Sequence, residues 1–134
     1  MKKLLVILAF FSIASFSLIA CGSTGSISSG SSSGSAQTGN TVHLTTNQFA
    51  QASITLHKGE SLTLSNDSGI PHIIANGTWK NGTPQIRREA GAPQVSSVQV
   101  AGSSSASIGP FNMSGIFHLY CTIHQDMNLS VVVQ

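Results

Sequence analysis

Residues 116–133 of the chain read IFHLYCTIHQDMNLSVVV. Apolar side chains recur at every second position at both ends of this stretch, which is the period of a β-strand with one buried face. We therefore expect strands over 116–121 and 128–133, joined by a loop over 122–127. The alternating residues are Phe117, Leu119, Cys121, Leu129, Val131 and Val133.

The same alternation continues upstream in short segments that turn-forming Gly, Asn, Asp and Ser residues separate. No long stretch shows a helical period, so the pattern favours a β-sandwich or a β-barrel. The segment 77–94 breaks the rhythm and holds Trp79, Pro84 and Pro93. We expect it to be a long loop with room for one helical turn, which a largely buried Trp79 anchors to the core. The alternating pairs are Val42 and Leu44, Ile54 and Leu56, Leu62 and Leu64, Val98 and Val100, and Ala106 and Ile108.

The composition excludes several classes of protein. Only 7% of the 134 residues are charged, whereas soluble domains average about 25%. The formal net charge of +2 comes from Lys2 and Lys3, because the other cations and anions balance. A neutral domain has no general electrostatic attraction for nucleic acid, so we expect no nucleic-acid partner. The low charge also argues against a coiled coil.

The N-terminus has the layout of an export signal. A short basic start, Met1-Lys2-Lys3, precedes an apolar run over 4–20 that ends in small residues. We interpret 1–20 as a signal peptide. The alternative is a membrane-spanning helix that is retained, for which seventeen apolar residues are at the short limit.

The segment Leu18-Ile19-Ala20-Cys21-Gly22 resembles the bacterial lipoprotein box. The resemblance implies that Cys21 becomes the new N-terminus and carries the lipid, and more than one acyl chain gives stable anchoring. The alternative is an ordinary cleaved signal that leaves Cys21 as a free thiol. Residues 22–40 are mostly Ser, Gly and Thr and carry no charge, so 21–40 is expected to form a lipidated, flexible linker. A single domain then occupies 41–134.

The loop over 122–127 and the cysteine just before it contain most of the candidate metal ligands. Cys121, His124 and Met127 follow one another at spacings of three, and His72 lies upstream after Pro71. Thiolate and thioether sulfur together with imidazole suit copper. Two His and one Cys with a weak axial Met form the ligand set of electron-transfer copper sites.

These residues and the strand pattern together resemble the cupredoxins, the blue copper family of plastocyanin, amicyanin and azurin. The resemblance covers most of 41–134, and the Cys-x2-His-x2-Met spacing is the short one of amicyanin. It implies a Greek-key β-sandwich of about seven to eight strands. It also implies one type 1 copper ion with His72, Cys121, His124 and Met127 as ligands. Many members have Asn or Ser after the first His, but here Ile73 follows, so no reduction potential is inferred by analogy.

Each proposed ligand also has a plainer interpretation. Cys121 would alternatively be a small buried hydrophobe or half of a disulfide with Cys21. His72 would be a core histidine, and Met127 would simply fill the core. His118 lies three residues before Cys121, but strand parity puts it on the opposite face. It is therefore not among the predicted ligands.

The sequence favours a membrane-tethered one-electron carrier that cycles between Cu(II) and Cu(I) outside the cytoplasm. It would exchange electrons with a redox protein donor and a redox protein acceptor, and the lipid at Cys21 would anchor it to the bacterial membrane. The alternative function is storage or delivery of copper, and a third is a structural β-sandwich without metal. An enzyme is not expected, because there is no His-x-His motif for further metals and no hydrolase or phosphate-loop motif.

Overall fold

A computed structural model describes residues 39–134 of the chain. The predicted signal peptide, the lipidation of Cys21 and nearly all of the predicted linker lie outside the described residues. In the described part, no helix is long and apolar enough to cross a membrane.

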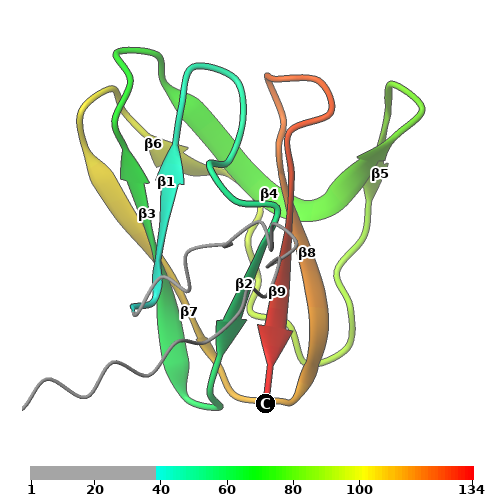
Figure 1. Cartoon of the computed structure of the whole chain (residues 1–134). Coiled ribbons are helices and arrows are strands. Elements are labelled where there is room, and N and C mark those ends of the chain that lie inside the picture. The colour runs from blue at the N-terminus through cyan, green and yellow to red at the C-terminus, as the bar shows by residue number, and fades with distance from the viewer. Residues whose placement is uncertain (1–38) are drawn as a thin grey trace, which may run out of the picture. The chain divides into compact units, whose positions relative to one another are not determined.

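The described residues form nine strands in two sheets (Figure 1). One sheet has three strands in the order β1-β3-β7, and the other has six in the order β2-β9-β8-β4-β5, with β6 also paired to β4. Pairing is antiparallel except for β1 with β3 and β2 with β9. The strands are β1 (Thr41–Leu44), β2 (Ser53–Leu56), β3 (Glu60–Asn66), β4 (His72–Lys80), β5 (Thr83–Ile86), β6 (Val98–Val100), β7 (Ser105–Phe111), β8 (Gly115–Cys121) and β9 (Asn128–Val133).

The core lies between the sheets and is built from the alternating residues. Burial in β9 alternates without exception from Asn128 to Val133, and both Leu62 and Leu64 of β3 are fully buried. Each such side chain contributes about 1.5–3 kcal/mol through burial. The predicted all-β sandwich is thus confirmed, and the strands expected over 116–121 and 128–133 form as β8 and β9.

The segment 77–94 departs from its prediction, because its first half is a β-hairpin rather than a loop. β4 continues to Lys80, and Asn81 and Gly82 then turn the chain into β5 with φ angles of 51° and 71°. Two positive φ angles are typical of the tight turn that an Asn-Gly pair favours. Pro84 is accommodated because β5 is an edge strand. This hairpin brings the strand number to nine rather than the expected seven to eight.

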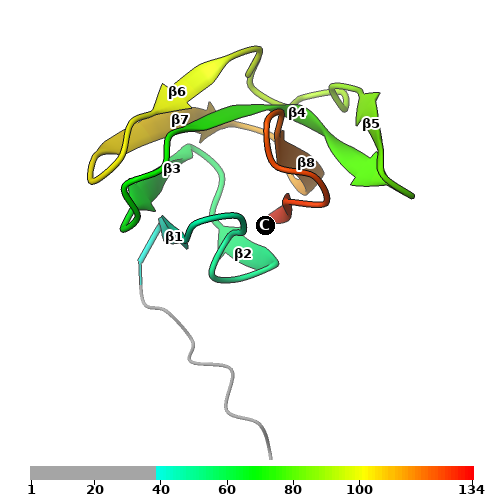
Figure 2. The same cartoon turned by 90° about the horizontal axis from the view of Figure 1, so that it is seen from above.

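Several connections gather at one end of the sandwich, at the top of Figure 1. They are the β1–β2, β3–β4, β6–β7 and β8–β9 loops and the tip of the β4–β5 hairpin. Figure 2 looks down on this end, with the β8–β9 loop in the middle and the hairpin to one side. The predicted ligands His72 and Cys121 stand at the ends of β4 and β8 that open towards these loops.

Hydrogen bonds between Glu89 and His118 hold the loop over 87–97 to the outer face of β8. Glu89 Oε1 lies 2.8 Å from His118 Nδ1, and the His118 backbone N–H donates to Glu89 Oε2 at 3.4 Å. Burial raises the pKa of the Glu89 carboxyl, but its hydrogen bonds to His118 outweigh this and leave the pKa below 4.5. His118 therefore lies on the face opposite Cys121, as strand parity predicts.

This lowered pKa predicts a pH-dependent contribution to stability. A carboxyl whose pKa is lower in the folded state stabilises the fold above its unfolded pKa and loses that contribution as the pH falls. We expect Glu89→Gln to lower the free energy of unfolding by less than about 1 kcal/mol at pH 7, because the pair is partly exposed. At pH 3 the difference from the unmodified protein should shrink. Thermal unfolding at both pH values measures this difference in stability, and the substitution of the exposed Asp126 by Asn is the control. A difference that does not depend on pH would contradict the role given to the Glu89 carboxylate.

Candidate metal centre

The ligand loop over 122–127 is a compact turn between two paired strands. The Cys121 backbone N–H donates to the Met127 carbonyl at 3.1 Å, and the Met127 N–H donates to the His124 carbonyl at 3.4 Å. Asp126 closes the turn with a φ of 59°, a conformation that Asp tolerates better than most residues. These bonds fix the backbone positions of three of the predicted ligands relative to one another.

The fourth predicted ligand, His72, is the first residue of β4. Ile74, two residues later, pairs with Cys121 of β8 on one side and with Val98 of β6 on the other. The Thr122 N–H also donates to the Ile73 carbonyl at 2.8 Å. A backbone hydrogen bond thus links the two ligand segments, although the Ile73 side chain has no polar group for this purpose.

The side chains of His72, Cys121 and His124 converge on one point. His124 Nδ1 lies 3.1 Å from His72 Nδ1 and 3.4 Å from Cys121 Sγ. Cys121 Sγ lies 3.8 Å from His72 Nδ1. In zinc sites imidazole nitrogen binds at about 2.0–2.1 Å and thiolate sulfur at about 2.3 Å, so ligand atoms around one ion are roughly 3–4 Å apart. The three donors therefore have the spacing of ligands that share a metal ion.

The cluster is shielded from solvent except at His124. Cys121 and His72 are fully buried, whereas His124 is half-buried. Burial lowers the pKa of His72, and the neighbouring His124 lowers it further. The backbone of Thr45 acts in the opposite direction and raises the pKa of His72. This effect is the smaller one, because the buried Nε2 of His72 has no hydrogen-bond partner of good geometry. A lowered pKa keeps the imidazole neutral, which leaves its Nδ1 lone pair free to bind a metal.

Met127 ends the ligand loop and is 1% exposed, as part of the hydrophobic core. The distances between donor atoms concern His72, Cys121 and His124, and the role of Met127 as a fourth ligand stays a prediction. Cys121 is a free thiol in the described part of the chain.

The β4–β5 hairpin contacts the ligand loop from the side. Trp79 Nε1 donates to the Cys121 carbonyl at 2.8 Å. The Asn128 side chain accepts from the Trp79 N–H at 2.6 Å and donates to its carbonyl at 3.2 Å. At the hairpin tip, a Cβ on Gly82 would come within 2.8 Å of the Gln125 side chain, so the tip and the loop are in close contact. The hairpin therefore braces the loop that carries His124.

Trp79, which the sequence predicts to anchor a loop to the core, is accordingly a supporting residue of the site. We expect Trp79→Phe to lower the free energy of unfolding by about 1 kcal/mol, because the Cys121 carbonyl loses its donor. Phenylalanine retains a ring for the edge-on packing against Tyr120, where the centroids are 6.0 Å apart. Hydrogen exchange of the 122–127 amides should become faster; unchanged exchange across this loop would contradict the bracing role.

Asn66, the last residue of β3, is a second supporting residue of the site. It is 3% exposed, and its Nδ2 donates to the carbonyls of Ile70 at 2.8 Å and Ala101 at 2.9 Å. Its Oδ1 accepts from the Ser68 N–H at 3.0 Å. Asn66 thereby fixes the β3–β4 loop that leads into His72. An Asn at the end of an alternating strand is the only sequence signal for this role.

Comparison with known proteins supports the architecture. Neither the protein-family models nor the curated proteins contain a match to this chain. Among solved structures, amicyanin from Paracoccus versutus (Thiobacillus versutus) is similar, with a TM-score of 0.53, 20% identity, and coverage of 70% of this chain and 79% of that chain. A Cu(I) form of a variant amicyanin is also similar, with a TM-score of 0.52 and 16% identity. This match covers 70% of this chain and 80% of that chain.

A purple cupredoxin from Nitrosopumilus maritimus is similar over nearly its whole length. The TM-score is 0.54, the identity is 16%, and the match covers 70% of this chain and 98% of that chain. At such low identities the likeness establishes the arrangement of the strands. The chain therefore has the cupredoxin fold.

Proposed function

We propose that this protein is a type 1 copper protein that carries single electrons. The observation that supports this most strongly is the triangle of two imidazole nitrogens and one cysteine sulfur, from His72, His124 and Cys121, of which only His124 is partly exposed. Two imidazoles and a thiolate in one plane, with Met127 as a weak axial ligand, are typical of electron-transfer copper. The Cu(I) form of an amicyanin with the same fold is consistent with this choice of metal.

Copper bound in such a site supplies a one-electron couple between Cu(II) and Cu(I). The protein contributes a rigid ligand frame, because the Cys121–Met127 and Thr122–Ile73 backbone bonds restrain both ligand segments. Burial excludes water from Cys121 and His72. A ligand frame that moves little when the copper ion changes its oxidation state favours rapid electron exchange. We propose no catalytic activity.

Electrons would enter and leave through the exposed edge of His124. Ile123 beside it is 51% exposed, and Ile70 on the neighbouring β3–β4 loop is 42% exposed. Exposed apolar side chains around a half-buried ligand favour short-lived docking with a redox protein donor or acceptor. Since the domain is neutral, we expect little long-range electrostatic steering.

We further propose that the protein is anchored to the bacterial membrane, outside the cytoplasm, by a lipid on Cys21. Support comes from the sequence alone, namely the export-signal layout and the lipoprotein box. The Ser- and Gly-rich segment 22–40 would let the domain reach its partners while keeping it close to them. Mass spectrometry of the membrane fraction tests this anchor by detecting an acylated N-terminal cysteine.

The visible spectrum of the purified full-length protein, after addition of one equivalent of Cu(II), tests the copper assignment. We expect an intense thiolate-to-copper absorption that bleaches on reduction and returns on reoxidation. Binding without colour, followed by rapid loss of Cu(I) to a chelator, would instead support copper storage or delivery. A colourless protein that binds no copper would eliminate both functions.

A further inference from the structure

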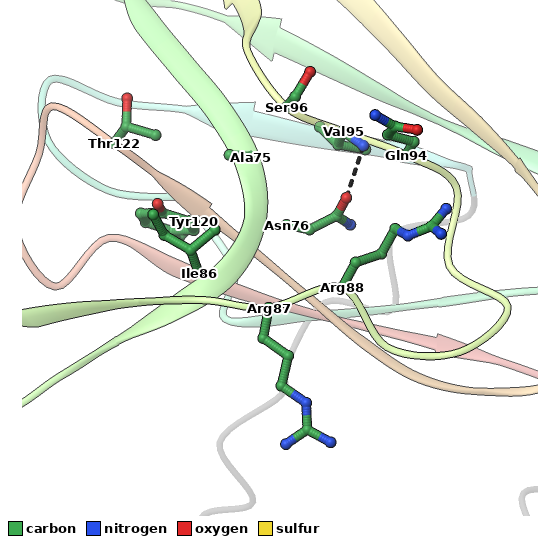
Figure 3. Close-up of a pocket in the computed structure, with 10 residues that line it drawn as sticks. All are labelled: Ala75, Asn76, Ile86, Arg87, Arg88, Gln94, Val95, Ser96, Tyr120 and Thr122. Carbon is green, nitrogen blue, oxygen red and sulfur yellow. Dashed lines mark hydrogen bonds between the residues drawn. The ribbon is translucent and has the colours of Figure 1, made fainter.

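A second concave site lies on the outer face of the six-stranded sheet, behind the ligand cluster. It is a groove of about 430 Å³ between β4, β8 and the 86–96 segment (Figure 3). Tyr120 and Thr122, which flank Cys121, both line it. Small-molecule sites have volumes of about 300–1,000 Å³, so the groove is large enough for a small organic ligand.

Asn76 lines this groove and carries a hydrogen-bond donor without a partner in the described residues. The side chain is 5% exposed, and its Oδ1 accepts from the Val95 N–H at 2.7 Å, the dashed bond in Figure 3. Its Nδ2 is buried and has no hydrogen-bond partner in the described part of the chain. Because an unpaired buried amide costs about 1–3 kcal/mol, a ligand acceptor at this atom would recover that free energy.

The charge of the groove is positive. Arg87 and Arg88 both line it, and no Asp or Glu does. In the described residues neither arginine forms an ion pair, and the nearby Glu89 is paired with His118. Figure 3 shows the Arg88 side chain on the same side as Asn76, while that of Arg87 points away. Arg88 NH1 has only one long contact, 3.5 Å to the Ala92 carbonyl.

Part of the remaining wall is apolar, beside the polar residues Gln94, Ser96 and Thr122. The apolar part comprises the Tyr120 ring and Ile86, which is 83% exposed, together with Ala75 and Val95. From the unpaired amide, the unpaired Arg88 and this apolar wall, we propose that the groove binds a small organic anion. The ligand would carry a carboxylate or phosphate for Asn76 and Arg88 and an apolar body for Ile86 and Tyr120. The inference does not depend on whether the ligand cluster holds copper.

Titration of the purified, isotope-labelled full-length protein by NMR tests the site. Any copper is reduced beforehand and the reductant is removed under argon, so that nearby resonances are not broadened and no other organic anion is present. Benzoate and phenyl phosphate are the anionic probes, and benzamide is a neutral probe of nearly the same shape. We expect both anions to shift the Asn76 side-chain amide saturably and benzamide to leave it unshifted. Arg88→Gln should weaken benzoate binding about tenfold, because it removes a hydrogen bond to a charged group.

Lys58→Gln is the matched control, since it removes one exposed positive charge on a turn that does not line the groove. It should change benzoate affinity by less than about twofold, as expected for screened charges. Equal losses in the Lys58 and Arg88 variants would overturn the site in favour of bulk charge. Equal binding of benzamide, or the absence of a saturable shift, would also overturn it. Inorganic phosphate that binds as tightly as phenyl phosphate would overturn the requirement for an apolar body.

Discussion

Cys121→Ser should abolish the intense visible absorption of the copper-treated protein. The band requires a thiolate bound to the metal, and a serine hydroxyl is a harder and poorer ligand for copper. Cys121 is fully buried, and its Sγ lies 3.4 Å and 3.8 Å from the two imidazole Nδ1 atoms. A serine of similar size can form hydrogen bonds with the same nitrogens, so we expect the fold to survive. Absorption spectroscopy with copper quantification separates loss of colour from loss of metal.

Cys21, the other cysteine of the sequence, provides the matched control. Cys21→Ser should leave the band of the purified protein unchanged, because Cys21 is proposed to carry the lipid anchor and is not among the proposed copper ligands. A band that persists in the Cys121 variant and disappears in the Cys21 variant would reverse the two assignments.

Gly77→Ala should destabilise the protein by about 2–5 kcal/mol, through backbone strain together with a clash. Gly77 has a φ of 133° at the point where β4 leaves β8 and enters the hairpin. A Cβ there would collide with the Gln85 carbonyl and come within 3.0 Å of the Tyr120 ring. Because Trp79 reaches Cys121 from the same hairpin, the substitution should also loosen the ligand loop. Denaturant unfolding measures the stability loss, and NMR of the 122–127 amides reports on the loop.

Gly59→Ala isolates the contribution of backbone strain. Gly59 also has a positive φ, 87°, but a Cβ at this turn would meet no atom within 4 Å. We expect it to cost only about 1 kcal/mol and to leave the ligand loop unchanged. Equal costs at the two glycines would show that the hairpin is not packed as the structure indicates.

The fold was predictable because nearly every strand has one buried face. Alternation from Phe117 to Cys121 and from Leu129 to Val133 fixes which side of each strand faces inward, and that period is visible in the sequence. The Cys121-x2-His124 pair was accessible for a related reason, since a short loop between paired strands keeps its two ends together. The structure also brings His72 to these two residues, as predicted.

The hairpin was missed because two local signals conflict. Pro84 argues against a strand, whereas Asn81-Gly82 favours a tight β-turn, and the edge position that reconciles them is a tertiary property. The contact of Trp79 with the Cys121 carbonyl depends on the bend at Gly77 and on the register of β4 against β8, neither of which the sequence specifies. The groove at Asn76 is equally a product of the loop after the hairpin. The predictions for 1–20 and Cys21 lie outside the described residues and stay predictions.

The position of β9 has a consequence for how the protein is made. β9 lies inside the six-stranded sheet, between β2 and β8, and its parallel partner β2 comes from near the start of the domain. As the chain emerges from its N-terminal end during the proposed export, β2 and β8 therefore lack the strand that joins them until residues 128–133 are available. Contacts between such distant segments form slowly. The two edges that await β9 are open to wrong pairing in the meantime. A chaperone that shields β2 and β8 until β9 arrives would raise the yield of folded protein more than one that acts on the early strands alone.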